Sequence, residues 1–382
     1  MEYVVGLLFF LIAHPYVFYP ASLILLNCRQ QHSQVQQVAE EECLPTISLL
    51  IAAYNEENVI ADKLVNAMKL DYPADKLEIV VGSDGSTDRT NEIVQTFASA
   101  ETNIKLLAYL QREGKANVLN KAVQQCAGEI VVFSDANAFY NASALKHMAG
   151  HFANPEIGCV AGEKKMKIAD DQDWIGENEG LYWKLESFVK RQESRLKTVI
   201  GADGAMYAIK KSLFTTLPRD TSVDDFLISM LIVLQGYRIA YEPRAFSCEA
   251  AGRSLAEELT RKVRIAAGNY YNLRYLQGLW GWNLLSYLFI SHKLLRWASP
   301  FIFIALTLCL FVQAFNPVYA WLLALLLASY GIAALGYCCE QQLLKYRVIS
   351  LITHFYLAVY AQFCGWIKYC KGTQKAIWDT IR

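Results

Sequence analysis

The chain has no net charge, because its 382 residues carry 36 basic and 36 acidic side chains. Proteins that bind nucleic acid through its phosphates usually show a basic excess, so the balance argues against a nucleic-acid partner. None of the ten cysteines forms a CxxC pair or a His/Cys spacing typical of zinc. No GxGxxG follows a predicted strand, which disfavours a dinucleotide-dependent oxidoreductase.

Charge is also missing from three long segments. Residues 3–28, 298–339 and 348–367 contain no Asp, Glu, Lys or Arg, and a membrane span needs about 20 apolar residues. The first segment lacks a basic start and a clear cleavage site, so it predicts an anchor over 1–28 rather than a signal peptide. Asn316-Pro317 reads as a turn, so residues 298–367 predict about three further transmembrane helices.

The charges that flank these segments indicate orientation. Glu2 precedes the first segment and Arg29 follows it, which favours a cytoplasmic side after residue 28. The sequence therefore predicts a multi-pass protein of the inner or plasma membrane whose middle domain is cytoplasmic. Four spans would place the basic tail, 368–382, on the opposite side, in conflict with the positive-inside rule. The sequence leaves that conflict open.

Two further regions connect these parts. Residues 29–44 form a polar linker, rich in Gln and Glu. Residues 253–297 mix tryptophans and tyrosines with basic side chains, a composition that predicts helices at the membrane interface and makes membrane lipid an expected partner.

The middle region, 45–252, alternates short β-branched runs with helical patterns. We expect strands over 46–54, 77–84, 103–110 and 129–135, with helices over 57–70 and 86–98 and another beginning near Gly114. Strand-helix alternation of this kind predicts an α/β domain with a parallel sheet.

Polar clusters follow three of these strands. Tyr54-Asn55-Glu56, Ser83-Asp84-Gly85 and 134–137 each stand where a strand ends. Any one of them could be turn or capping chemistry. Together they should meet at the carboxyl edge of the sheet, where open α/β sheets bind ligands.

Asp224 and Asp225 stand side by side before an apolar run. One reading makes Ser222 the N-cap of a helix and Asp225 the closing residue of a capping box. The other makes Asp225 a catalytic base mounted at a helix start, and the pair alone does not decide. A glycosidase pair is disfavoured, because such carboxyls face each other across a bond at about 5 to 9 Å and adjacent residues diverge.

Six segments together resemble the membrane-bound family 2 glycosyltransferases, which include hyaluronan, cellulose and chitin-oligosaccharide synthases. They are IAAYNEE (51–57), VGSDGSTD (81–88), REGKANVLN (112–120), FSDANA (133–138), GADGAMYAIKK (201–211) and VDDFLISMLIVLQGYRIAYEP (223–243). The resemblance covers roughly residues 45–300. It implies a GT-A fold with a mixed, mostly parallel sheet over 45–252, a nucleotide-sugar donor, a divalent cation and inversion at the anomeric carbon.

The resemblance assigns roles at the metal and the base. Asp135 matches the first acidic position of the family's DxD motif, and Asn137 takes the second as a weaker, neutral ligand for Mg²⁺ or Mn²⁺. Asp225 matches the last Asp of the family's ED motif, and Asp224 stands where Glu is usual. Single displacement needs a base to take the proton of the acceptor hydroxyl, so Asp225 is the expected base.

Further matches concern the donor and the acceptor. Ala53, Tyr54 and Glu56 match the loop that holds base and ribose, and Asp84 matches the carboxylate at the nucleobase. Lys115 reads as a phosphate ligand or as a solvated helix charge. Asp203 reads as part of an acceptor-side loop or as a turn residue.

The segment 261–268 departs from the QxxRW motif of processive family members. Arg264 matches its Arg, whereas Arg261 and Ile265 replace Gln and Trp. The two arginines share one helix face, where they would clamp a diphosphate or lie near anionic lipid. Ile265 offers no aromatic platform for a sugar, so we expect short products or a single transfer.

The resemblance therefore implies an inverting hexosyl- or acetylhexosaminyl-transferase that uses a nucleotide-sugar, in the first place a UDP-sugar. Its acceptor would be a glycan or a lipid-linked molecule in polysaccharide or surface glycan synthesis, with export or modification proteins as possible partners. One alternative has the same fold and transfers a single sugar to a polyprenyl phosphate. Another is a non-catalytic membrane scaffold, against which the intact Asp135 and Asp225 argue.

Overall fold

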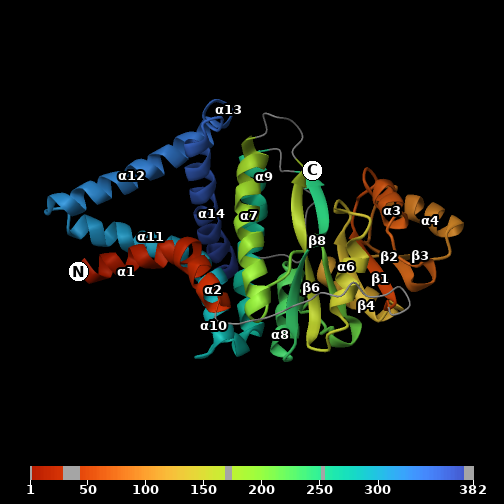
Figure 1. Ribbon diagram of the computed structural model, residues 1–382. Coiled ribbons are helices and arrows are strands. Elements are labelled where there is room, and N and C mark those ends of the chain that lie inside the picture. The colour runs from red at the N-terminus through yellow and green to blue at the C-terminus, as the bar shows by residue number, and fades with distance from the viewer. Residues whose placement is uncertain (1, 29–43, 168–173, 251–253, 374–382) are drawn as a thin grey trace.

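The computed structural model describes residues 2–28, 44–167, 174–250 and 254–373. The linker and most of the basic tail expected from the sequence lie outside these ranges. A sheet with its covering helices occupies one end of the molecule and apolar helices occupy the other. Two long helices, α7 (Trp174–Leu196) and α9 (Leu255–Asn272), stand between them (Figure 1).

The first half of the domain is a parallel sheet. Its strands are β1 (Ile47–Ala53), β2 (Leu77–Asp84), β3 (Ile104–Tyr109) and β4 (Ile130–Asp135), and β1 lies between β2 and β4. Every residue of β1 is buried, as expected for a strand covered by helices on both faces. Those helices are α3 (Ile60–Met68), α4 (Thr90–Ala100) and α5 (Lys115–Gln125). All four predicted strands are confirmed.

The second half extends the sheet with mixed pairing. It adds β5 (Phe139–Tyr140), β6 (Ile157–Lys167), β7 (Tyr207–Lys210) and β8 (Arg238–Ala250), with α6 (Ala144–His151) and α8 (Asp224–Leu234). The strand order is β3-β2-β1-β4-β7-β6-β8-β5. β7 runs antiparallel to β4 and β6, whereas β6 and β8 are parallel. The predicted mixed, mostly parallel sheet is confirmed.

The helices α7 (Trp174–Leu196) and α9 (Leu255–Asn272) connect the sheet domain to the apolar helices. Glu186 of α7 accepts from His292, Lys293 and Arg296 at 2.9, 2.7 and 2.8 Å. The Nδ1 of His292 lies 2.7 Å from Oε1 of Glu193, a second residue of α7. The Tyr19 hydroxyl donates to the same oxygen. This buried network fixes both apolar ends of the chain to the sheet domain.

Within the ranges that the structure describes, four helical segments are long and apolar enough to cross a membrane, by length and composition: Glu2–Cys28, Leu284–Val312, Pro317–Cys338 and Arg347–Cys370. They comprise α1 (Glu2–Ala13), α2 (Tyr19–Cys28), α10 (Leu284–Phe289), α11 (Leu295–Val312), α12 (Pro317–Cys338) and α14 (Arg347–Cys370). Short π-helical turns at His14–Phe18 and Ile290–Leu294 join the first two pairs, and α13 (Glu340–Leu343) precedes α14. Each overlaps a segment expected from the sequence, but the second begins at Leu284, inside the region 253–297 that was expected at the membrane interface. The domain boundaries stay a prediction.

Short 3-10 turns are found in the described part of the chain at Ala74–Lys76, Lys211–Leu213, Leu273–Tyr275 and Gln277–Leu279.

The apolar helices pack on one another. Val5 of α1 packs with Leu306 and Leu310 of α11, and residues of α12 cover them. The helices α1, α11 and α12 therefore form one bundle.

Candidate active site

Lys115 joins two carboxylates that are far apart in the sequence. It is the first residue of α5, and its Nζ lies 2.8 Å from Oδ1 of Asp135 and 3.3 Å from Oδ2 of Asp224. Burial by itself raises the pKa of the Asp135 carboxyl, but the Lys115 ammonium outweighs burial and holds that pKa below its usual value. The alternative reading of Lys115 as a solvated helix charge is wrong.

Asp225 lies in the first turn of α8, but not as part of a capping box. The helix begins at Asp224 after Val223, whose side chain makes no capping hydrogen bond. Ser222 instead packs against α9, where a Cβ added at Gly268 would lie 2.5 Å from its Oγ. The Oδ1 of Asp225 accepts the N–H of Phe226 at 2.8 Å, so the capping-box reading is corrected.

The protonation of Asp225 is perturbed in the direction that suits a base. Burial, followed by the charge of Asp224, raises the pKa of the Asp225 carboxyl to about 7, and Lys115 opposes the rise. A carboxyl that titrates near neutrality holds a proton more readily than an ordinary Asp while still being ionised at mildly alkaline pH.

Gly204 marks the point where the two carboxylates meet. A Cβ built on Gly204 would lie 3.2 Å from Oδ2 of Asp225 and 3.7 Å from Oδ2 of Asp135. Three separate elements therefore converge here: the end of β4, the start of α8 and the loop that carries Gly204. Because glycine has no side chain, residue 204 places no atom of its own between the two carboxylates.

Asp203, the residue before, is held by a partner that the sequence did not reveal. Its Oδ2 contacts the Nζ of Lys190, a buried residue of α7. Burial lowers the pKa of Lys190, but the charges of Asp203 and Glu186 raise it by more than burial lowers it. The pKa of Lys190 therefore lies above its usual value. The pair fixes the 201–204 loop against α7. An acceptor role for Asp203 stays a prediction.

The loops at the ends of β1 and β2 form a second cluster. The Arg112 guanidinium lies 3.8 Å from the centre of the Tyr54 ring, a cation–π contact. Asn55 has a left-handed φ of 51°, and its Oδ1 accepts the N–H of Thr87 at 2.8 Å. Tyr54 and Arg112 are half-buried, so they present a flat, charged surface beside the sheet edge. The sequence motifs had not singled out Arg112.

Asp84 is almost completely buried and is already engaged. Its two oxygens accept the backbone N–H groups of Glu113 and Gly114 at 2.8 and 2.9 Å, which positions the loop directly before Lys115. Ala53 and Glu56 are buried as well. Contacts of these three residues with base or ribose stay predictions, and the role visible for Asp84 is to hold the loop.

Asn137 follows β4 and is half-buried. The next residue, Ala138, is fixed by Lys63 of α3, whose fully buried ammonium donates to the Ala138 carbonyl. Burial lowers the pKa of Lys63 to about 7. A lysine within the apolar face of α3 was the one sequence signal for this contact, since Ile60, Leu64 and Ala67 share that face.

The helix α9 borders the site through Arg264, whose charge helps to lower the pKa of Asp135. Arg261 and Arg264 are half-buried, and the Ile265 side chain is 36% exposed. A diphosphate clamp formed by the two arginines stays a prediction.

A divalent cation fits the donor set in part. Among the described residues no group of three or more His, Cys, Asp or Glu side chains is arranged to hold a metal ion. The Asp135 carboxylate contacts Lys115 through Oδ1, but the Asp135 side chain is still 38% exposed. Mg²⁺ is commonly bound by one or two carboxylates with water and substrate phosphates supplying the rest, and Asp135, with Asn137 two residues later in the sequence, suits that kind of site.

Comparisons with known proteins find similarity to glycosyltransferases. Residues 48–217 match the sequence model described as "Glycosyl transferase family 2". A poly-beta-1,6-N-acetyl-D-glucosamine synthase of Staphylococcus epidermidis is 29% identical over 251 residues, which are 64% of this chain and 58% of that protein. The same enzyme of Staphylococcus aureus (strain MSSA476) is 30% identical over 233 residues, 59% of this chain and 55% of the relative. The match thus spans somewhat more than half the length of these relatives.

A solved structure shares the fold over nearly the whole chain. The mannosyltransferase PcManGT from Pyrobaculum calidifontis, in complex with GDP-Man and Mn²⁺, superposes with a TM-score of 0.75. It covers 97% of this chain and 98% of its own, at 23% sequence identity. The likeness extends to the apolar helices and shows that the fold is the GT-A type with flanking helices.

Proposed function

Because this chain is a family 2 glycosyltransferase, homologous to polysaccharide synthases, we propose that it transfers a sugar from a nucleotide-sugar to a hydroxyl acceptor with inversion. The observation that carries this proposal is the meeting of Asp135 and Asp225 at Gly204. One carboxylate borders the place for a diphosphate, and the other is a base beside it. The acceptor is a glycan or a lipid-linked molecule at the membrane.

The proposed reaction is a single displacement. The acceptor oxygen attacks the anomeric carbon, the bond from that carbon to the diphosphate breaks, and the nucleoside diphosphate leaves. The proton of the acceptor hydroxyl passes to the Asp225 carboxylate. The raised pKa of Asp225 supports this role, because burial and the charge of Asp224 make it a stronger base than an exposed Asp. Asp224 acts through Asp225 and Lys115 and positions both.

Asp135 and Asn137 would hold a divalent cation, Mg²⁺ or Mn²⁺, on the donor side. When bound, such an ion neutralises the charge that develops on the leaving diphosphate. Lys115 supplies positive charge from the chain itself at the same place, and Arg264 borders it from α9. Tyr54 with Arg112 offers the flat surface on which a nucleobase would stack.

The names of the relatives indicate which donor sugars to test first. An N-acetylhexosamine is the first sugar to test because the two curated relatives are named for it, and GDP-mannose is the second because the solved neighbour contains it. We propose a UDP-sugar as the donor class.

Release of the nucleoside diphosphate tests the proposal. Purified full-length protein, reconstituted in lipid, would be given single nucleotide-sugars with Mg²⁺ or Mn²⁺, and the products would be examined by mass spectrometry and by NMR of the new anomeric centre. We expect release with one donor and an inverted centre in the product. A retained configuration would reject the single displacement, and absence of release with every donor would favour the scaffold.

A further inference from the structure

The helix α14 qualifies as a membrane span by length and composition, whereas the helix α9 beside it does not. It runs alongside α9, and α9 carries five charged residues within its 18: Glu257, Glu258, Arg261, Lys262 and Arg264. Charged side chains at the centre of a bilayer cost several kcal/mol each. A helix with this composition therefore lies outside the hydrocarbon layer, in contact with water.

Contacts tie α14 to α9 along its whole length. Near its start, His354 Nδ1 lies 3.1 Å from Oε2 of Glu258. Further along, a Cβ built on Gly365 would lie 2.4 Å from the Cβ of Ala266, so the two backbones approach closely. At its end, the Tyr369 hydroxyl accepts from Nε of Arg274, in the 3-10 turn that follows α9, at 3.0 Å. Successive parts of α14 therefore lie beside α9 or beside the turn that follows it.

The two faces of α14 differ in the way expected of a helix at a membrane surface. A stripe of mostly small residues is buried at helical spacing: Ser350, Thr353, Leu357, Ala361 and Gly365. On the side away from this stripe, Val348, Leu351 and Trp366 are apolar and exposed by 69, 54 and 37%. Such a helix packs one face on protein and inserts the other into the boundary of the acyl chains.

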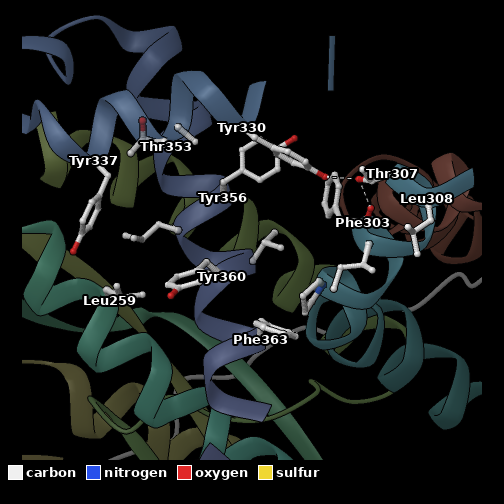
Figure 2. Close-up of a pocket in the computed structure, with 16 residues that line it drawn as sticks. Leu259, Phe303, Thr307, Leu308, Tyr330, Tyr337, Thr353, Tyr356, Tyr360 and Phe363 are labelled. Carbon is white, nitrogen blue, oxygen red and sulfur yellow. Dashed lines mark hydrogen bonds between the residues drawn. The ribbon is translucent and has the colours of Figure 1, made fainter. Parts of the chain in front are cut away.

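The direction of α14 also differs from that of the bundle. In Figure 1, α14 stands beside α7 and α9 and turns away from α12 at α13. A cavity of about 800 Å³ lies between α11, α12 and α14, and Leu259 of α9 also lines it. Figure 2 shows its tyrosine and apolar side chains around this space. Among the described residues, no charged side chain lines the cavity, which suits acyl chains of the bilayer beneath a helix at its surface.

We propose that α14 lies along the membrane surface and does not cross it, with its apolar side against the acyl chains of the leaflet that faces the catalytic domain. In the described part of the chain, the segment Glu2–Cys28, α11 and α12 then cross the membrane. The end of α14, with Lys368, and Lys371 directly after it stay on the side of the catalytic domain. This arrangement removes the conflict between four spans and the positive-inside rule, because the basic residues then lie where that rule places them. It does not depend on the proposed reaction.

Cysteine accessibility in sealed, oriented membrane vesicles tests the topology on the full chain. Three single cysteines would be placed in a variant without the natural ten: Lys371→Cys after α14, Lys105→Cys in the sheet domain and Asn316→Cys in the α11–α12 turn. All three positions are exposed. A membrane-impermeant maleimide should label Lys371→Cys and Lys105→Cys in vesicles of the same orientation, and Asn316→Cys in the opposite one.

Labelling of Lys371→Cys together with Asn316→Cys would overturn the proposal and restore four spans. If the variant without cysteines does not fold, a protease site added after Arg382 of the natural chain gives the same answer. Protease outside the vesicles should cut this site only when it also reaches the sheet domain. Cleavage in vesicles whose sheet domain is enclosed would contradict a surface position for α14.

Discussion

The Nζ of Lys115 lies 2.8 Å from Oδ1 of Asp135, so the start of α5 is tied by charge to the end of β4. The same ammonium lies 3.3 Å from Asp224, whose side chain is only 7% exposed. One lysine therefore balances two acidic groups on neighbouring elements, and its loss would leave Asp224 with a buried, poorly paired charge.

We expect Lys115→Met to destabilise the protein by about 2 kcal/mol, because an uncompensated buried charge is costly and the partial exposure of Asp135 reduces the effect. Thermal unfolding of the detergent-solubilised protein would measure it. Lys121→Met is the matched control, since its pair with Glu113 is 45 and 41% exposed and should contribute little. Equal melting temperatures for the two variants would show that the Lys115 pairs do not stabilise the fold.

Asp225→Asn should keep the fold and the affinity for the donor, because size and hydrogen bonding change little. Turnover should fall by about 10² or more, as is typical when a general base is lost. Release of nucleoside diphosphate, together with donor binding measured separately, checks both parts. The exposed Asp220 gives the control Asp220→Asn, which should behave as the natural chain. Near-normal turnover in Asp225→Asn would remove the base assignment.

The raised pKa of Asp225 predicts a pH profile. The carboxyl is protonated below about pH 7 and cannot then accept the acceptor proton. Activity should therefore fall as the pH is lowered through about 7, whereas an ordinary Asp would keep it down to about 4. Initial rates at low donor concentration, measured with the stability of the protein checked at each pH, would show this loss of activity on the acidic side. A constant rate between pH 8 and pH 5 would contradict the assignment.

Chelation tests the cation. Activity should vanish in excess EDTA and return with Mg²⁺ or Mn²⁺. Asp135→Ala should abolish transfer, and Asn137→Ala should weaken it less, because an amide oxygen is the poorer ligand. Asp75→Ala, at an exposed position before β2 and so at the opposite end of that strand from Asp84, serves as the control. Full activity in the presence of chelator would reject a metal-dependent mechanism.

The helix α9 carries a prediction on product length. Arg264→Ala should raise the donor KM and lower the rate, because Arg264 adds positive charge beside Asp135. The exposed Arg219 provides the control Arg219→Ala. Ile265→Trp should lengthen products if it changes them, since an indole ring offers the sugar a stacking surface that Ile265 lacks. Long polymer from the natural chain would contradict the expectation of short products.

The local pattern of the sequence determined the first four strands, the apolar helices and the polar ends of β1, β2 and β4. Alternation of apolar residues and the chemistry of turns act over a few neighbouring positions, and such short-range signals can be read without a structure. The motifs also placed Asp135 and Asp225 in one site, which their convergence at Gly204 agrees with.

Only the tertiary structure decided which groups pair. No sequence motif assigned a role to Lys63, Lys190 or Arg112, yet each contacts a backbone or side chain brought to it by folding. Ser222 had the right spacing for a cap, but packing against Gly268 takes its side chain elsewhere. The direction of α14 depends on its contacts with α9, which hydropathy does not record. Burial and distant partners set the energy of a charge, and both come into being only when the chain is packed.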